Sequence, residues 1–240
     1  MNQIENKQDG KYYWRYDAEF FNNISADYFS PEYWQQKQAI IGQETGRGTT
    51  FFVQHDEVQL VLRHYLRGGM MRHLSRDQYW FQGLEATRSF AEFTLLADLS
   101  KRGFAVPKPA AAQIVRQGLR YRADLLTHKI PKAQDLVQAL QAAQSADFYL
   151  QLAEFIAGFH KQGVFHADLN IQNILQDSEG KFWLIDFDRA QLRTPDSTWQ
   201  QANLKRLKRS FEKESIRHQI QWTEADWSVF YDAYLASNSR

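Results

Sequence analysis

The sequence predicts an α+β protein with two lobes, a β-rich first half and a helical second half. Segments rich in β-branched and aromatic residues, separated by glycines, fill the chain up to Pro131. Beyond Pro131, apolar residues recur at helical spacing. The chain has 240 residues, 43% of them hydrophobic, which is enough for one large domain or two small lobes. We expect an N-terminal extension (1–35), a β-rich lobe (36–130) and a helical lobe (131–240), with a cleft between the lobes.

The first predicted strands flank a glycine-rich turn within residues 39–54, AIIGQETGRGTTFFVQ. The turn contains Gly46 and Gly48 between β-forming residues, so a hairpin is expected. The apolar run at 58–66 predicts a third strand. Residues 63–80, which are rich in arginine, predict a loop-rich insertion after it.

A helix and a second hairpin complete the first half. The predicted helix has four apolar residues at helical spacing and ends at a glycine, namely Phe90, Phe93, Leu96, Leu99 and Gly103. The second hairpin joins residues 114–115 to residues 121–130 through a turn at Gln117–Gly118. Pro131 ends this hairpin and the β-rich half.

The second half is predicted to be mainly helical. Its first helix has one apolar face and ends at Gly163; the face consists of Phe148, Leu152, Phe155, Ile156 and Phe159. A polar stretch and a short apolar strand, KFWLIDFDRA, follow this helix, and residues 198–240 again predict helix.

Composition excludes several classes of protein. There are no cysteines, which excludes disulfides and thiolate metal sites and suits a reducing compartment. The N-terminus lacks the apolar segment of a signal peptide, and no apolar run is long enough for a membrane span. The net charge of +1, without an RNP-like or helix-turn-helix signature, argues against nucleic-acid binding.

A group of polar residues lies inside an apolar frame at 163–175, GVFHADLNIQNIL. It is either a buried polar turn or a catalytic loop. Asn173 follows Asp168 by five positions, and Asp186 follows Asn173 by thirteen, across a turn at 178–180. A hairpin there would bring Asn173 and Asp186 together, and their oxygens suit Mg²⁺ with phosphate. A nearby carboxylate could accept a proton from a substrate hydroxyl.

This spacing resembles the catalytic set of protein kinases, H-R-D-L-x-x-x-N followed by D-F-G. The chain has HADLNIQN at 166–173 and DFD at 186–188. The resemblance implies a bilobal protein-kinase-like fold, with Asp168 as catalytic base and His166 as a structural support. It also implies that Asn173 and Asp186 hold Mg²⁺.

The resemblance covers about residues 40–190 and implies an ATP site between the lobes. In the family, a glycine-rich hairpin, a basic residue on the third strand and a helix with glutamate precede the catalytic loop. The corresponding residues, with a hinge for adenine, are Gly46, Arg47, Gly48, Arg63, Glu92, Lys129 and Ile130. Arg63 replaces the usual lysine; it either pairs with Glu92 and donates to phosphates or is an edge-strand arginine. The glycine turn is either a phosphate clamp or a plain hairpin.

Other departures from the kinase pattern indicate the type of substrate. Ala167 replaces the arginine that reads activation-loop phosphorylation, Asp188 replaces the glycine of D-F-G, and no A-P-E follows. These departures argue against a phospho-regulated protein kinase. They favour a kinase-like fold that acts on a small molecule or a glycolipid.

Two basic segments are candidates for contact with that substrate. Arg67, Arg72 and Arg76 lie near Met, Tyr and Trp in the 63–80 insertion, which suits an anionic lipid acceptor or a solvated loop. The helix at 204–213, LKRLKRSFEK, has an apolar face with basic residues around it. That basic face is either solvated or attracted to an anionic membrane surface.

Four stretches taken together resemble the 3-deoxy-D-manno-octulosonic acid (Kdo) kinases of Gram-negative lipopolysaccharide biosynthesis: VLRHYLRGG, RADLLTHKIP, VFHADLNIQNIL and WLIDFDRA. The resemblance implies ATP- and Mg²⁺-dependent phosphorylation of the 4-hydroxyl of Kdo on a Kdo–lipid A acceptor. It also implies peripheral association with the cytoplasmic face of the inner membrane. The alternatives are a lipopolysaccharide heptose kinase and a non-catalytic pseudokinase scaffold, and the oligomeric state is left open.

Overall fold

The computed structural model describes residues 3–45, 48–67 and 77–238. The chain divides into two compact units. The first contains Met1–Lys101 and Pro107–Lys129, and the second contains Arg102–Val106 and Ile130–Arg240.

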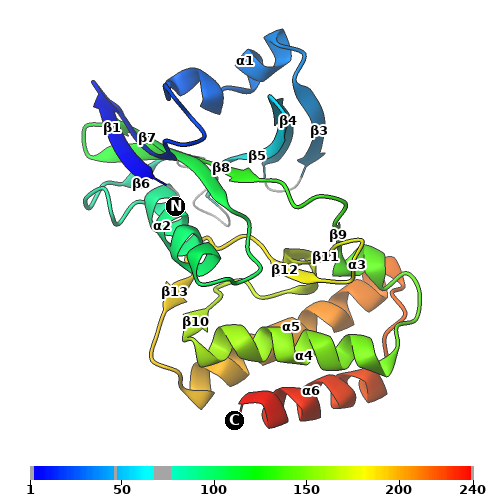
Figure 1. Cartoon of the computed structure of the whole chain (residues 1–240). Helices are drawn as coiled ribbons and strands as arrows, with labels where there is room; N and C mark the ends of the chain where they lie inside the picture. The colour runs from blue at the N-terminus through cyan, green and yellow to red at the C-terminus, as the bar shows by residue number, and fades with distance from the viewer. Residues whose placement is uncertain (1–2, 46–47, 68–76, 239–240) are drawn as a thin grey trace. The chain divides into compact units, whose positions relative to one another are not determined.

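An eight-stranded antiparallel sheet forms most of the first unit (Figure 1). Its order is β1-β2-β7-β8-β5-β4-β3, and the short β6 also pairs with β8. The strands are β1 (Ile4–Asp9), β2 (Tyr12–Asp17), β3 (Ile40–Thr45), β4 (Thr49–His55), β5 (Val58–His64), β6 (Tyr79–Trp80), β7 (Pro109–Gln117) and β8 (Arg120–His128). Helix α2 (Arg88–Lys101) packs on β7 and β8, and a 3-10 turn (Ala26–Phe29) and α1 (Pro31–Gln36) follow β2.

The expected elements of the β-rich half are present. Strands β3 and β4 form the predicted hairpin, β5 pairs with β4, and β7 and β8 form the second hairpin. The last residue pair of the β7–β8 hairpin is Gln117 with Arg120. Gly118 in the turn has φ of +60°, which glycine adopts at little cost. The four apolar residues that predicted α2 are all buried.

The first 35 residues differ from the expected extension, because the structure places two strands there. Strand β2 pairs with β7, and β1 pairs with β2, so both belong to the sheet. Trp14 and Tyr16 point into the core at alternate positions of β2, but Tyr13 and Arg15 are partly buried and Asp17 is buried. Strand β1 (IENKQD) exposes nearly all of its side chains as an edge strand. Neither strand therefore shows a clear two-residue period in the sequence.

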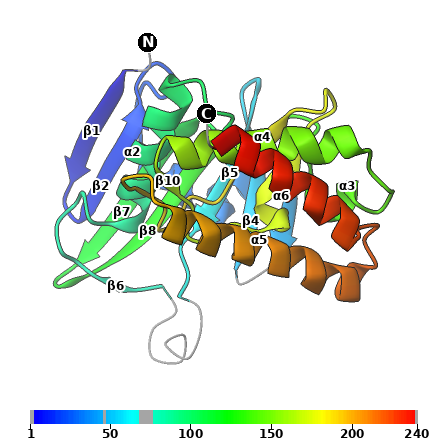
Figure 2. The ribbon, with the colours of Figure 1, turned by 90° about the horizontal axis from the view of Figure 1, so that it is seen from below.

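The second unit is mostly helical (Figure 2). Its helices are α3 (Leu136–Ala139), α4 (Ala146–Lys161), α5 (Ser197–His218) and α6 (Glu224–Asn238), with a 3-10 turn at Ile171–Asn173. The strands are β9 (Gln134–Asp135), β10 (Val164–Phe165), β11 (Ile174–Gln176), β12 (Phe182–Leu184) and β13 (Gln191–Leu192). They form a three-stranded sheet, β12-β11-β9, and the pair β10-β13.

Helix α4 is the core element of this unit and packs along α6. Ser145 caps its N-terminus by accepting a hydrogen bond from the N–H of Phe148. The predicted apolar face is buried, with Phe155 only partly covered. Gly163 ends the helix region with φ of +74°, as expected for a glycine stop. Among the helices of the described residues, none is long and apolar enough to cross a bilayer.

Candidate active site

The β11–β12 hairpin brings Asn173 and Asp186, two of the predicted site residues, to one of its ends. Ile174 pairs with Leu184, and the N–H of Ile185 donates to the carbonyl of Asn173 across 2.9 Å. Asn173 precedes β11 and Asp186 follows β12, so both lie at this end of the hairpin. The hairpin inferred from spacing is therefore present.

Asp186 adopts a backbone conformation that is unusual for a residue with a side chain. Its φ is +59°, in the left-handed region, which costs about 1 kcal/mol for a non-glycine residue. The next residue, Phe187, is buried, and its ring lies edge-on to His166 at 5.1 Å. Packing of Phe187 thus holds the turn in which Asp186 is placed. Local strain of this kind is typical of functional sites.

His166 links the predicted catalytic-loop segment, residues 163–175, to the DFD segment, residues 186–188. Its Nε2–H donates to the carbonyl of Ile185 (3.0 Å), and its Nδ1 accepts from the N–H of Asp168 (3.3 Å). These two partners require the neutral tautomer with the proton on Nε2. Complete burial lowers the pKa of His166, which also favours the neutral ring. His166 is therefore a structural support, as the sequence predicts.

Asn170, to which the sequence assigned no role, shapes the loop. Its Oδ1 accepts from the N–H groups of Gln172 (2.9 Å) and Asn173 (3.2 Å), which caps the 3-10 turn. Its Nδ2 donates to the carbonyl of Asp168 (2.9 Å). The exposed side chain of Gln172 lines a cavity of 390 Å³ together with residues of α3 and α5.

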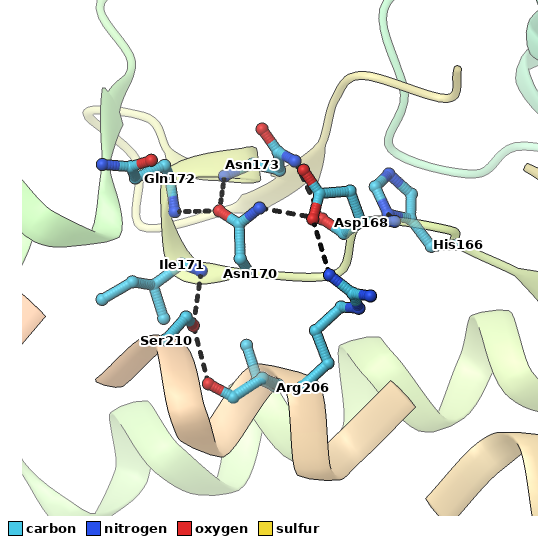
Figure 3. Close-up of polar contacts among 9 residues, drawn as sticks. His166, Asp168, Asn170, Ile171, Gln172, Asn173, Arg206 and Ser210 are labelled. Carbon is cyan, nitrogen blue, oxygen red and sulfur yellow. Dashed lines mark hydrogen bonds and ion pairs between the residues drawn. The ribbon is translucent and has the colours of Figure 1, made fainter. Parts of the chain in front are cut away.

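Asn173 is oriented by the same carbonyl of Asp168. Its Nδ2 donates to that oxygen across 2.9 Å, so its own amide oxygen points away from it (Figure 3). This oxygen and the carboxylate of Asp186 are hard donors that fit Mg²⁺. The described residues contain no group of three or more His, Cys, Asp or Glu side chains arranged for a metal. A Mg²⁺ ion shared with phosphates needs only one or two protein ligands, so the pair fits.

Helix α5 supports the loop through three residues that sequence analysis did not assign to the site. Asn203 accepts from the N–H of His166 (3.3 Å), and Ser210 accepts from the N–H of Ile171 (3.1 Å). Between them, Nη1 of Arg206 lies 3.1 Å from Oδ1 of Asp168 (Figure 3). The signal in the sequence is that these three polar residues lie at i, i+3 and i+7, which places them on one side of the helix. The sequence prediction for this helix considered only its apolar and basic faces.

The first unit contains the ion pair expected between β5 and α2. Nη2 of Arg63 lies 2.5 Å from Oε1 of Glu92, whose side chain is 2% exposed. The hydroxyl of Tyr65, which sequence analysis did not select, donates to Oε2 of Glu92 (2.5 Å) and accepts from Arg63 (3.2 Å). Arg63 is thus fixed in direction by two neighbours.

The remaining predicted residues fall in several places. Gly48 immediately precedes β4 and lies against Leu66, whose side chain a Cβ at this position would overlap. The guanidinium of Arg67 lies over the ring of Tyr79 at 5.1 Å. Lys129 is the last residue of the first unit and donates its N–H to the carbonyl of Gln59, and Ile130 begins the main segment of the second unit. Gly46, Arg47, Arg72 and Arg76 lie outside the described residues.

Comparison with known proteins gives a consistent result. Residues 31–234 match the "Lipopolysaccharide kinase (Kdo/WaaP) family". A protein of Vibrio vulnificus named 3-deoxy-D-manno-octulosonic acid kinase is 46% identical over 96% of this chain and 98% of its own length. A protein of the same name from Vibrio cholerae is 50% identical over 81% of this chain and 83% of its own length. Another, from Haemophilus influenzae, is 43% identical over 95% of this chain and 98% of its own length.

Proposed function

Because the chain belongs to the lipopolysaccharide kinase (Kdo/WaaP) family, it is a kinase, and we propose that it phosphorylates the 4-hydroxyl of Kdo on a Kdo–lipid A acceptor. The observation that carries this proposal is that Asn173 is hydrogen-bonded to Asp168 in one loop, with Asp186 at the same end of the β11–β12 hairpin as Asn173. The names of the relatives support Kdo as the sugar. The site geometry supports phosphoryl transfer.

In this proposal Asp168 orients the acceptor hydroxyl. Its carboxylate is nearly half exposed, at 44%, so a substrate can reach it. Phosphoryl transfer proceeds through a loose transition state in which positioning matters more than base strength. The carboxylate of Asp168 holds the hydroxyl in line and accepts its proton late.

The donor nucleotide is ATP in this proposal, held with Mg²⁺. Asn173 and Asp186 would hold the ion, which neutralises charge on the phosphates when bound. Arg63 donates to phosphate oxygens, with Glu92 and Tyr65 setting the direction of its guanidinium. The proposed assignments also keep Gly46–Gly48 over the phosphates, Lys129–Ile130 at the adenine, and the arginines of the 63–80 insertion at the acceptor.

We further propose peripheral association with an anionic membrane surface, at the cytoplasmic face of the inner membrane. A lipid A acceptor is itself anchored in a membrane. Lys205, Arg209 and Lys213 recur every fourth residue along α5, and all three are exposed. Basic helix faces of this kind are attracted to anionic lipids. Co-sedimentation with anionic vesicles, but not with neutral ones, would support this part.

A direct assay tests the proposed reaction. The protein is incubated with labelled ATP, Mg²⁺ and Kdo–lipid A, and a heptosylated core without unsubstituted Kdo serves as comparison. We expect label on the Kdo acceptor and phosphate at its 4-position by mass spectrometry. Transfer only to the heptosylated core would indicate a heptose kinase. No transfer to either acceptor would leave the fold without the proposed activity.

A further inference from the structure

Arg206 is the charged member of the three α5 residues that contact the catalytic-loop segment. Asn203 and Ser210 accept from main-chain N–H groups, as a structural brace would. Arg206 instead presents a guanidinium to the side chain of Asp168, the proposed catalytic base. Structural support of the loop does not require a positively charged side chain at position 206, so the charge of Arg206 needs a separate explanation.

The contact between Arg206 and Asp168 can exchange partners. It is a single bond between Nη1 and Oδ1, and the two side chains are 45% and 44% exposed. Exposed ion pairs contribute little to stability. A guanidinium has five N–H donors arranged as a fork, and one of them suffices for this bond. Within the part of the chain that the structure describes, no other acidic side chain contacts Arg206.

Arg206 approaches Asp168 from the side opposite the proposed metal ligand. In Figure 3, Asn173 lies above Asp168 and Arg206 reaches it from below, out of α5. If Asn173 marks the side of the metal and the phosphates, Arg206 faces the other side of the base. The molecule on that side is the acceptor whose hydroxyl Asp168 orients.

We infer that Arg206 binds the carboxylate of the acceptor sugar and so selects an acidic sugar over a neutral one. The inference rests on the proposed function. In Kdo the carboxylate is attached to the ring carbon two positions from C4, so acid and reactive hydroxyl lie on neighbouring parts of one ring. Nη1 of Arg206 lies 3.1 Å from Oδ1 of Asp168, so both side chains are within reach of one sugar ring. Guanidinium and carboxylate form two parallel charge-assisted hydrogen bonds, which also fix orientation.

The test compares two acceptors that differ in one group. Kdo–lipid A in neutral detergent micelles is used as the free acid and as the Kdo carboxamide. Wild-type protein, Arg206→Gln, Arg206→Lys and Arg217→Gln are assayed for acceptor KM, ATP KM and kcat. Arg217 is a matched control because it is exposed on the same helix, three turns along the same side.

For wild-type protein we expect the carboxamide to raise acceptor KM about 10- to 100-fold, in line with the strength of charge-assisted hydrogen bonds. Arg206→Gln should raise KM for the acid by a similar factor and leave KM for the carboxamide unchanged. Arg206→Lys should keep part of the preference for the acid, because lysine retains the positive charge. The preference should be smaller than in wild type, because lysine lacks the fork geometry of arginine. Arg217→Gln should behave as wild type, and no variant should change ATP KM.

Other outcomes overturn the inference. If Arg206→Gln keeps the wild-type ratio between acid and carboxamide, or raises KM for both equally, Arg206 does not read the carboxylate. A rise in ATP KM instead of acceptor KM would place Arg206 on the nucleotide side. Absence of transfer by wild-type protein to the free acid would overturn the proposed function together with the inference. An unchanged acid-to-carboxamide ratio, an equal rise in both acceptor KM values, or a rise in ATP KM would overturn the inference alone.

Discussion

Arg63 of β5 and Glu92 of α2 form an ion pair in which Nη2 and Oε1 are 2.5 Å apart. The carboxylate is almost completely buried, and the guanidinium is 23% exposed. The hydroxyl of Tyr65 donates to the second carboxylate oxygen. A buried carboxylate is tolerated only when such partners compensate for lost hydration. The pair therefore couples the stability of the first unit to the direction of a proposed phosphate-binding side chain.

Replacing Arg63 with glutamine should destabilise the protein and weaken nucleotide binding. Loss of the cation from a buried pair costs about 3 kcal/mol, because the remaining charge stays desolvated. Urea unfolding measures the change. Arg122→Gln is the control, since its partner Asp77 is 25% exposed and surface pairs contribute about 0–1 kcal/mol. Equal losses in the two variants would contradict a buried role for Arg63.

Replacing Asp168 with alanine should lower kcat severely while leaving ATP binding nearly intact. General base and orienting groups contribute about 10²- to 10⁴-fold to rate. Steady-state turnover and calorimetric titration with ATP and Mg²⁺ provide the two measurements. Near-wild-type turnover would exclude the role assigned to Asp168.

Replacing Asp186 with alanine should abolish the Mg²⁺-dependent part of nucleotide binding. Titrations with and without Mg²⁺ measure this part, and Glu179→Ala, an exposed acid in the same hairpin turn, should leave it unchanged. Asp186→Gly should lose the same binding. It should be more stable than Asp186→Ala by about 1 kcal/mol, because glycine adopts a positive φ without strain. Mg²⁺-dependent binding in both variants would remove Asp186 from the metal site.

Acid should destabilise the second unit through His160. Its ring is buried in α4, within 2.8 Å of the hydroxyl of Tyr234, and burial lowers its pKa to about 4. The unfolded chain binds a proton near pH 6.5, whereas the folded protein does so only near pH 4. Stability is therefore full above pH 6.5 and falls as the pH drops toward 4, by on the order of 3 kcal/mol from this group.

Urea unfolding at several pH values tests this prediction. His160→Gln should be less stable than wild type at pH 8 but should lose less stability between pH 6.5 and 4. Burial also lowers the pKa of His128 to about 4, so some acid sensitivity should remain in the variant. If the free energy of unfolding falls with pH by the same amount in wild type and variant, the assignment to His160 is contradicted.

Local pattern determined much of the fold. The glycine-rich hairpin, the apolar face of α2, the β7–β8 hairpin and the apolar face of α4 were predicted from spacing and turn residues. The β11–β12 hairpin was predicted in the same way, and with it the placement of Asn173 and Asp186. Periodicity and turn chemistry act within a few residues of the chain, so a single sequence contains them.

Long-range packing decided the rest. The polar edge strand β1 and the aromatic β2 belong to the sheet only because β7, a hundred residues on, pairs with β2. Arg206 meets Asp168, and Asn203 meets His166, across 38 and 37 positions of sequence. A polar stripe on α5 marks Asn203 and Arg206, but it does not say which residues they contact. The burial and hydrogen bonding of segments that fold against each other select these partners. The sequence by itself determined which segments resemble the kinase catalytic set, and tertiary packing decided that α5 brings a cation to Asp168.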